Sequence, residues 1–339
     1  LLLAGFQSTG TRGRSLLEGQ KEIKIHGMYH EINCEIISSD SFSAHADQDD
    51  LIAWLKKRGI SDALINRTMR QLDTATALGE GKKLYYANKD VYRLLRYGVK
   101  DKEGAGELNQ TVWLIDWHHP EANDFAIAEE VYIKGENKKR PDIVLYINGI
   151  ALGVLELKRS LVDVSEGIRQ NLDNQKKDFI RNFFSTIQLV MAGNDTQGLR
   201  YGMIETPEKY YLEWKEELNH VEGHKLDYHL GRMCNKQRFL QIIHDFIVFD
   251  AGVKKTCRHN QFFGIEAAKQ RIAKREGGII WHTQGSGKSL TMVWLAKWIR
   301  ENVSDSRVLI VTDRTELDEQ IEKVFTGVEE EIYRTKSGV

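Results

Sequence analysis

The segment Trp281–Ser289, with the sequence WHTQGSGKS, constrains the fold of this chain more than any other feature. The apolar run Gly278–Trp281 leads into it, and a helical pattern at Leu290–Arg300 follows it. The next apolar run, Val308–Thr312, has the composition of a parallel strand, so the stretch predicts a β-strand, a phosphate-binding loop, a helix and a second β-strand in series. His282 stands where the general loop pattern has its first glycine.

The residue types in this loop are those that bind a nucleoside triphosphate. Gly285 and Gly287 let backbone N–H groups close around phosphates, and the dipole of the following helix favours anions there. Lys288 is expected to reach the β- and γ-phosphates, and Ser289 to bind Mg²⁺. The sequence therefore predicts ATP and Mg²⁺ as cofactors. The expected nucleotide-binding residues are Gln261, Thr283, Gln284, Gly285, Ser286, Gly287, Lys288 and Ser289.

Gln261 is included because its amide could read the edge of an adenine, although a glutamine without a phosphate loop nearby is usually a surface residue. After Arg314 no apolar strand with an acidic pair appears, and the run 329–331 has the character of a solvated charge cluster. No second lobe follows to supply an arginine. We therefore expect this chain to bind ATP better than it hydrolyses it.

A second constellation lies between Arg140 and Lys158. Two apolar segments flank Asn148-Gly149, which is a strong hairpin signal. Glu156 and Lys158 are two apart on a strand and share one face, and Asp142 begins the opposite strand. Two carboxylates can hold Mg²⁺ against a phosphate while a lysine orients or deprotonates water, which is the chemistry of phosphodiester hydrolysis.

The register of this hairpin tests the idea. A plain two-residue loop pairs Asp142 with Leu155 and turns it away from Glu156. A three-residue loop, or one bulge near Gly149 or Gly153, pairs Asp142 with Glu156 instead. We predict that irregularity. The alternative interpretation is polar residues at strand ends, and the nearby basic run, which could contact DNA phosphates or simply be solvated, comprises Lys134, Lys138, Lys139 and Arg140.

Composition narrows the class of protein. The chain has 339 residues, with 48 Lys and Arg against 49 Asp and Glu, so a uniformly basic nucleic-acid coat is excluded but local patches are not. Three cysteines without a Cys-x-x-Cys pair provide neither a disulfide framework nor a zinc finger. No run of about 18 apolar residues occurs, so no membrane span is expected and a reducing cytoplasm fits best.

Periodicity predicts the remaining elements, which we use below to test the fold. The predicted helices are Asp47–Lys57, Ala63–Leu78, Lys89–Tyr97 and Glu266–Lys274, with helical linking stretches at Tyr210–Glu217 and Phe239–Phe249. The predicted strands are Val112–Asp116, Phe125–Ile133, Ile143–Ile147 and Ala151–Lys158, with a surface loop at Lys100–Asn109.

From about Leu55 to Val339 these motifs resemble the restriction (motor and nuclease) subunit of type I restriction enzymes. The carrying segments, in the order and spacing of that family, are VWLIDW at 112–117, PEANDF at 120–125, RPD at 140–142 through ELK at 156–158, WHTQGSGKS at 281–289 and VTDRTELDEQ at 311–320. His282 also matches the usual pattern of that family.

The resemblance implies an α/β chain with a PD-(D/E)xK-type mixed-sheet nuclease domain followed by an incomplete RecA-like translocase lobe. It assigns Asp142 and Glu156 as metal ligands, Lys158 as the catalytic lysine and Gln170 as the glutamine of a Gln-x-x-x-Tyr element, whose tyrosine position holds Asn174 here. It also implies cleavage of double-stranded DNA after ATP-driven translocation, with separate specificity and methylation subunits as partners.

Residues 1–56 are similar instead to the C-terminal end of a β-CASP metallo-β-lactamase-type RNA-processing nuclease. The carrying segments are GTRGRSLL at 10–17 and FSAHAD at 42–47. His45 would be a vestigial zinc position, because one ligand cannot hold zinc. The expected division is therefore a fused segment 1–56, a nuclease domain 57–232 and a truncated translocase lobe 233–339.

Several functions remain open from sequence. The first is the subunit of an ATP-dependent type I restriction endonuclease. Others are an ATP-independent Mg²⁺ nuclease and an inactive DNA- and nucleotide-binding fragment of a fused reading frame. A zinc-dependent ribonuclease is the fourth. Cleavage without nucleotide would distinguish the second from the first, and bound zinc would be needed for the last.

Overall fold

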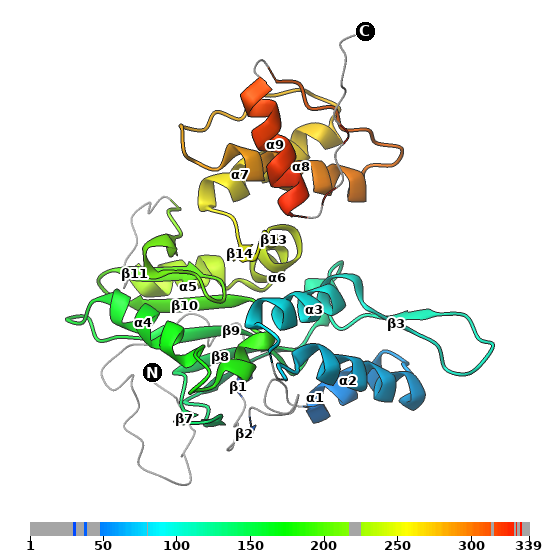
Figure 1. Cartoon of the computed structure of the whole chain (residues 1–339), viewed down its shortest axis with the longest axis vertical. Helices are drawn as coiled ribbons and strands as arrows, with labels where there is room; N and C mark the ends of the chain where they lie inside the picture. Colours follow the sequence, from blue (N-terminus) through cyan, green and yellow to red (C-terminus); the bar gives the residue numbers. More distant parts are fainter. Residues whose placement is uncertain are drawn as a thin grey trace. The chain divides into compact units, whose positions relative to one another are not determined.

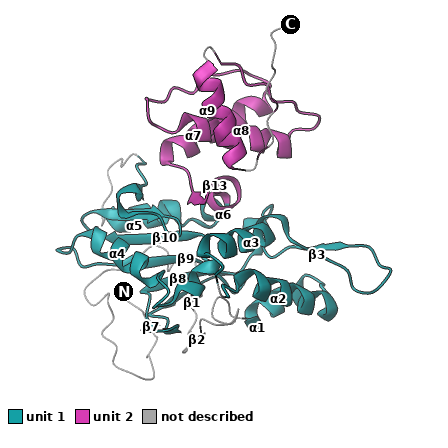
Figure 2. Ribbon diagram, in the orientation of Figure 1, with its two compact units in different colours: residues 1–240 teal, residues 241–339 magenta. Residues whose placement is uncertain are grey.

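The computed structural model describes residues 30–31, 37–38, 48–79, 81–216, 225–312, 315–328, 330 and 333, the first two pairs as backbone only. The chain divides into two compact units, residues 1–240 and 241–339 (Figure 2). This division after residue 240 lies close to the domain boundary expected after residue 232. The helix Gln48–Lys57 belongs to the first unit, since its Trp54 donates a hydrogen bond to the carbonyl of Ala122 at 3.2 Å.

The first unit is built on a seven-stranded sheet (Figure 1). Its order is β1-β5-β8-β9-β10-β11-β12, in which β1 and β5 are parallel, β9 and β10 are parallel, and all other neighbours are antiparallel. The mixed sheet predicted for this region is therefore confirmed. The strands are β1 His30–Glu31, β5 Phe125–Glu129, β8 Ile143–Ile147, β9 Ile150–Leu157, β10 Leu189–Asn194, β11 Gly198–Gly202 and β12 Leu212–Glu213.

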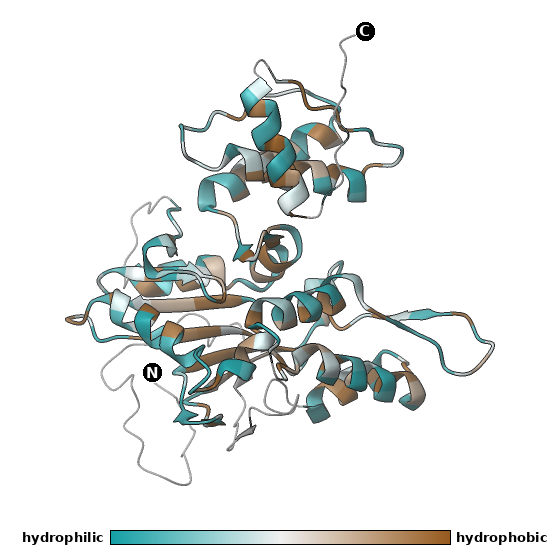
Figure 3. Ribbon diagram, viewed as in Figure 1, coloured by the Kyte–Doolittle hydropathy of each residue, from teal (hydrophilic) through white to brown (hydrophobic). Residues whose placement is uncertain are grey.

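Helices cover both faces of this sheet, which is why its central strands are apolar on both sides (Figure 3). On one face, α4 crosses between the parallel strands β9 and β10 and packs on them. On the other, Gly153 faces the ring of Phe239 and Gly193 faces Leu226. The helices of this unit are α1 Gln48–Lys57, α2 Asp62–Thr76, α3 Leu84–Tyr97, α4 Val164–Asn174, α5 Lys225–Met233 and, crossing the unit boundary, α6 Lys236–Asp245.

The hairpin of β8 and β9 contains the predicted irregularity. Ile147 pairs with Ile150 around Asn148-Gly149, but beyond Leu145 the register shifts by one residue. Ala151 and Val154, an odd number of positions apart, consequently both point into one apolar cluster. Beyond the bulge Ile143 pairs with Leu155, so the next residues outward, Asp142 and Glu156, fall opposite each other on the face covered by α4.

Three sequence predictions for this unit were wrong. The strand expected at Val112–Asp116 ends at Val112, as β4 Gln110–Val112 paired with β3 Val99–Asp101. The strand expected at Phe125–Ile133 is interrupted because Glu130 has a φ of 51°. The helix expected at Tyr210–Glu217 is a 3₁₀ turn, Glu208–Tyr210, and then β12. A small second sheet joins β2 Ile37–Ser38, β6 Ile133–Lys134 and β7 Lys138–Lys139.

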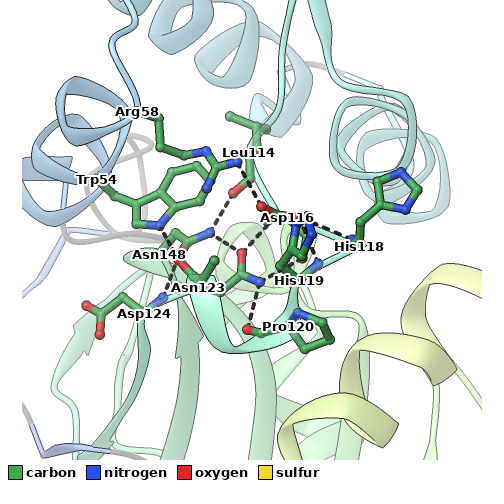
Figure 4. A network of polar contacts seen from close by, with 11 residues as sticks. Trp54, Arg58, Leu114, Asp116, His118, His119, Pro120, Asn123, Asp124 and Asn148 are labelled. Carbon is green, nitrogen blue, oxygen red and sulfur yellow. Dashed lines mark hydrogen bonds and ion pairs between the residues drawn. The ribbon is translucent and has the colours of Figure 1, made fainter.

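The residues after Val112 are held by the side chain of Asn148 instead of by a neighbouring strand (Figure 4). Its amide nitrogen donates to the carbonyl of Leu114 at 2.8 Å and to Oδ1 of Asn123 at 2.9 Å. Its own Oδ1 accepts from the backbone N–H of Asp124 at 2.7 Å. Asn148 is fully buried with a φ of 51°, a region that asparagine tolerates better than most residues. The Asn148 side chain therefore fixes this loop to the β8–β9 hairpin.

We expect Asn148→Ala to lower the free energy of unfolding by about 3 kcal/mol. The substitution leaves buried backbone groups without partners, at about 1–3 kcal/mol each, and places alanine in the left-handed region. Urea unfolding followed by tryptophan fluorescence measures the change. Asn148→Gly allows the left-handed backbone conformation but loses the side-chain hydrogen bonds. Its free energy of unfolding should therefore exceed that of Asn148→Ala only by the cost of placing alanine in that conformation. A loss below about 1 kcal/mol for the alanine variant would contradict this account.

The second unit has a helical core. Val293 and Ala296 of α8 pack against Ile321 and Phe325 of α9. Among its described residues the only strands are the two of a short hairpin. The elements are β13 Val248–Asp250, β14 Val253–Lys255, α7 His259–Ala273, α8 Lys288–Asn302 and α9 Thr315–Gly327.

The two parallel strands expected at Gly278–Trp281 and Val308–Thr312 are not formed. Both segments are irregular, and alternate apolar side chains in them are exposed, Trp281 at 90% and Leu309 at 85%. An apolar segment becomes a strand only when a neighbour satisfies its backbone groups, and no described segment pairs with either. The predicted RecA-like sheet is therefore absent from the described residues. Within the same part of the chain, no helix combines the length and apolarity that crossing a membrane requires.

Candidate functional site

The hairpin brings two carboxyl groups together at its open end. Asp142 accepts a hydrogen bond from the backbone N–H of Leu157 at 2.7 Å, which fixes its carboxylate against β9. Glu156 is fully buried beneath α4, and Asp142 is 6% exposed. The pairing of these two residues, which depended on the bulge, is what the sequence predicted.

Burial perturbs both acids in the same direction. It raises the pKa of Asp142, against the opposing effects of the Leu157 N–H and the Lys158 charge. Burial raises the pKa of Glu156 well above its usual range, and the neighbouring charge of Asp142 raises it further. Two carboxylates that are costly to ionise side by side in a buried position are a common arrangement where a cation or a shared proton is held.

Lys158 and Gln170 complete the cluster. The Lys158 ammonium lies 3.9 Å from Oε2 of Glu156 and donates a hydrogen bond to Oε1 of Gln170 at 2.7 Å. The amide nitrogen of Gln170 donates to Oε2 of Glu156 at 2.6 Å. Gln170 therefore connects the acid and the base from α4, and all four residues selected from sequence lie in one cluster.

Asn174 was not expected to contribute, yet it lies one helical turn beyond Gln170 on the same face of α4. Its amide nitrogen is 3.5 Å from Oε1 of Glu156, and its Oδ1 is buried without a hydrogen-bond partner among the described residues. Gly167 makes this approach possible, because a Cβ there would lie 3.1 Å from that of Ala192 on β10. The signal in the sequence was the Gln-x-x-x-Asn spacing, which presents two amides to one site.

The second unit contains the predicted loop with its expected local geometry. Gly285 and Gly287 have φ of 76° and 86°, and α8 starts directly afterwards with no side chain capping its N-terminus. The exposed Lys288 ammonium donates to the carbonyls of Thr283 at 2.9 Å and His282 at 3.3 Å. A phosphate could replace these carbonyls as the acceptor. Of the remaining loop residues singled out from sequence, Gln284 and Ser286 lie in this turn, and Ser289 is the second residue of α8.

Gln261 lies against this loop, but its amide is engaged within the chain. Its nitrogen donates to the carbonyl of Gly287 at 2.9 Å, and its oxygen accepts from the N–H of Arg258 at 2.8 Å. The side chain is 3% exposed, so reading an adenine would require these contacts to be exchanged. That role stays a prediction. His45 lies outside the described residues, and within them no group of three or more His, Cys, Asp or Glu could hold a metal.

The fold and the two sites define an α/β protein with a buried acid–lysine cluster in one unit and a phosphate-type loop in the other. The chain belongs to the family described as type I restriction enzyme R protein N terminus, which matches residues 25–209, more than half of its length. This match begins inside the segment 1–56, for which the sequence had suggested another origin. Residues 260–338, including the loop, match the SWI2/SNF2 ATPase family.

Curated relatives agree with this membership. The type I restriction enzyme HindI endonuclease subunit of Haemophilus influenzae is 28% identical over 281 residues, covering 76% of this chain and 26% of that protein. The type I restriction enzyme SsaAORF53P endonuclease subunit of Staphylococcus saprophyticus is 27% identical over 222 residues, covering 62% and 23% respectively. The chain spans about a quarter of the length of the curated relatives it matches.

Proposed function

We propose that this chain carries the DNA-cleaving centre of a type I restriction endonuclease, formed by Asp142, Glu156 and Lys158 in a PD-(D/E)xK-type arrangement. The observation that carries the proposal is the buried pair of carboxylates with an ammonium group 3.9 Å from one of them. The reaction would be Mg²⁺-dependent hydrolysis of a phosphodiester in double-stranded DNA.

The residues present suit Mg²⁺. This ion prefers carboxylate oxygens, and Asp142 and Glu156 offer them from adjacent strands, with Asp142 fixed by the Leu157 N–H. Burial raises the pKa of both acids, so a bound divalent cation would offset the cost of ionising them side by side. When bound there, Mg²⁺ would polarise the phosphate and lower the pKa of attacking water.

The protein groups have separable roles in this proposal. Lys158 would donate hydrogen bonds to the scissile phosphate or to the attacking water. Gln170 restrains both Lys158 and Glu156, so it is a positioning residue rather than a catalytic one. The Asn174 amide, beside the other oxygen of Glu156, limits rotation of that carboxylate.

The second unit would bind Mg²⁺-ATP through Lys288 and Ser289, with the backbone of Gly285 and Gly287 around the phosphates. Within the whole subunit, ATP hydrolysis would drive DNA translocation before cleavage, in a complex with specificity and methylation subunits. An ATP-independent nuclease and an inactive fragment are the alternatives, and the experiment below separates them.

The test measures nicking of supercoiled DNA by the purified wild-type chain and two variants in the presence of Mg²⁺. Each protein is assayed with and without ATP. We expect Asp142→Asn to reduce cleavage about 10³-fold, since losing several kcal/mol of metal-borne stabilisation costs roughly a factor of ten per 1.4 kcal/mol. The asparagine Oδ1 can still accept from Leu157, so the fold should persist. Glu107→Gln, an exposed carboxylate in the β3–β4 loop, is the control. Equal cleavage by all three proteins would exclude the proposed centre.

A further inference from the structure

We propose that a basic pocket beside the carboxylate cluster binds the phosphodiester backbone of the DNA that the cluster would cut. For the identity of its ligand this inference rests on the proposed function. The pocket has a volume of about 540 Å³. Three separate segments form it: the α2–α3 loop, the β6–β7 hairpin loop and the stretch after α4. Its lining includes Lys82, Lys83, Glu136, Lys177, Phe179 and Arg181.

The described side chains that line the pocket carry four positive charges and one negative charge. Two of the cations have acidic partners: Lys82 lies 3.0 Å from Asp90, and Arg181 lies 4.0 Å from Glu205. Lys83 and Lys177 are exposed and have no ion pair within the described part of the chain. Like charges gathered around a concave surface raise the local concentration of anions. The two unpaired ammonium groups can therefore receive phosphates without breaking an existing ion pair.

The walls of the pocket are held in place by contacts between its segments. The N–H of Glu136 donates to the carbonyl of Phe179 at 3.2 Å, and the Asn137 amide donates to the carbonyl of Asp178 at 2.6 Å. Gly135 lies so close to Phe179 that a Cβ would meet its carbonyl oxygen at 2.1 Å. The hairpin is thus docked on the stretch after α4, and the pocket is a formed feature rather than a gap between loops.

The same hairpin connects the pocket to the carboxylate cluster. The Lys139 ammonium lies 4.1 Å from the centre of the Phe179 ring, which lines the pocket. The residue after Phe179 is also tied to the cluster, because the N–H of Ile180 donates to the carbonyl of Asn174 at 3.2 Å and the Asn174 amide lies 3.5 Å from Oε1 of Glu156. Asn174, which contacts Glu156, is three residues before Lys177 on the chain. A DNA strand with one phosphate at Glu156 would therefore have cationic groups along one side, from Lys139 into the pocket.

A DNA backbone suits this arrangement better than a compact anion. Strand phosphates recur about every 3.4 Å along the helix axis, so a row of cations can contact several of them at once. Phe179 and Leu78 add apolar surface between the charges, against which deoxyribose can pack. No base-reading group is needed, and the contacts would be independent of sequence.

The experiment measures binding of a labelled DNA duplex to the full chain in EDTA, where no cleavage occurs, across a range of salt concentrations. We expect the double variant Lys83→Ala/Lys177→Ala to bind about tenfold more weakly at low salt. The slope of log affinity against log salt should fall by about 1.8, since each phosphate contact contributes about 0.9. Lys57→Ala/Lys102→Ala removes two exposed charges elsewhere on the same unit and should match the wild type.

The outcomes distinguish this inference from the proposed nuclease. Unchanged affinity and slope in the double variant would overturn the pocket, whatever the chain cleaves. Weaker binding in the double variant, with no cleavage by the wild type, would leave the pocket standing and remove the proposed nuclease. Inorganic tripolyphosphate is the second probe. Displacement of the duplex by micromolar tripolyphosphate, in the wild type but not in the double variant, would assign the pocket to free polyphosphate and overturn the DNA assignment.

Discussion

Glu156→Gln is expected to abolish Mg²⁺-dependent DNA cleavage, by at least about 10³-fold, while making the metal-free protein more stable at pH 8. The loss follows because a neutral amide is a poor Mg²⁺ ligand, and several kcal/mol of stabilisation disappear with the ion. The gain follows because Glu156 is fully buried beside Asp142, so ionising it in the folded chain is costly. Glutamine has nearly the same shape and removes that cost.

The pH dependence gives the sign of this effect. The pKa of Glu156 is raised in the folded protein, so the folded state holds its proton more tightly than the unfolded state does. Stability from this group is therefore present in full below the unfolded pKa, near 4.3, and is lost as the pH rises through the folded value. The raised pKa of Asp142 acts in the same direction. The metal-free wild type should lose stability above pH 5 more steeply than Glu156→Gln does.

Thermal unfolding in EDTA measures the gain in stability, and thermal unfolding in Mg²⁺ measures the loss of metal binding. In EDTA at pH 8 the variant should melt at least about 3 °C above the wild type, the shift that roughly 1 kcal/mol produces in a domain of this size. A ten-fold excess of Mg²⁺ over its Kd should add about 1.4 kcal/mol to the wild type and nothing to the variant. Glu107→Gln should match the wild type throughout. A Mg²⁺ response that persists in Glu156→Gln would place the metal elsewhere.

The part of this site that sequence predicted is local. Asp142, Glu156 and Lys158 lie on one hairpin, and requiring both carboxylates on one face was enough to predict an irregularity. Sequence left open a three-residue loop or a bulge near Gly149 or Gly153, and the structure has the bulge near Gly153. The contribution of Asn174 depends on the angle at which α4 crosses the sheet. Gly167 lets α4 approach β9 and β10 this closely, and no periodicity in the sequence encodes the approach. The basic pocket was missed for a related reason, since its three segments meet only in the folded chain.

The failed strand predictions have a common physical cause. Residues 113–116 are apolar enough for a strand, but no described strand pairs with them. The amide of Asn148, distant in sequence, donates to the carbonyl of Leu114 instead. Gly278–Trp281 and Val308–Thr312 have strand composition without a neighbouring strand among the described residues. The composition of a segment shows that it can form a strand, but the strand forms only where a neighbouring strand pairs with it.

Lys288→Ala is expected to weaken Mg²⁺-ATP binding about 100-fold without unfolding the second unit. A charge-assisted hydrogen bond contributes about 1.5–3 kcal/mol, and each 1.4 kcal/mol is a factor of ten in affinity. The fold should tolerate the change, because the ammonium group is exposed and its hydrogen bonds within the described residues go to the carbonyls of His282 and Thr283. Alanine is also a good residue for the first turn of α8.

Isothermal titration with Mg²⁺-ATP measures the affinity, and far-ultraviolet circular dichroism monitors the helices. Lys323→Ala, an exposed lysine of α9, removes the same charge from the same unit and should leave binding unchanged. Equal affinities in the wild type and Lys288→Ala would mean that the loop does not hold the triphosphate. Loss in both variants would indicate that net charge rather than the loop attracts ATP. Only a loss confined to Lys288→Ala assigns the triphosphate to the N-terminus of α8, where Gly285 and Gly287 already adopt the backbone conformation that surrounds a phosphate.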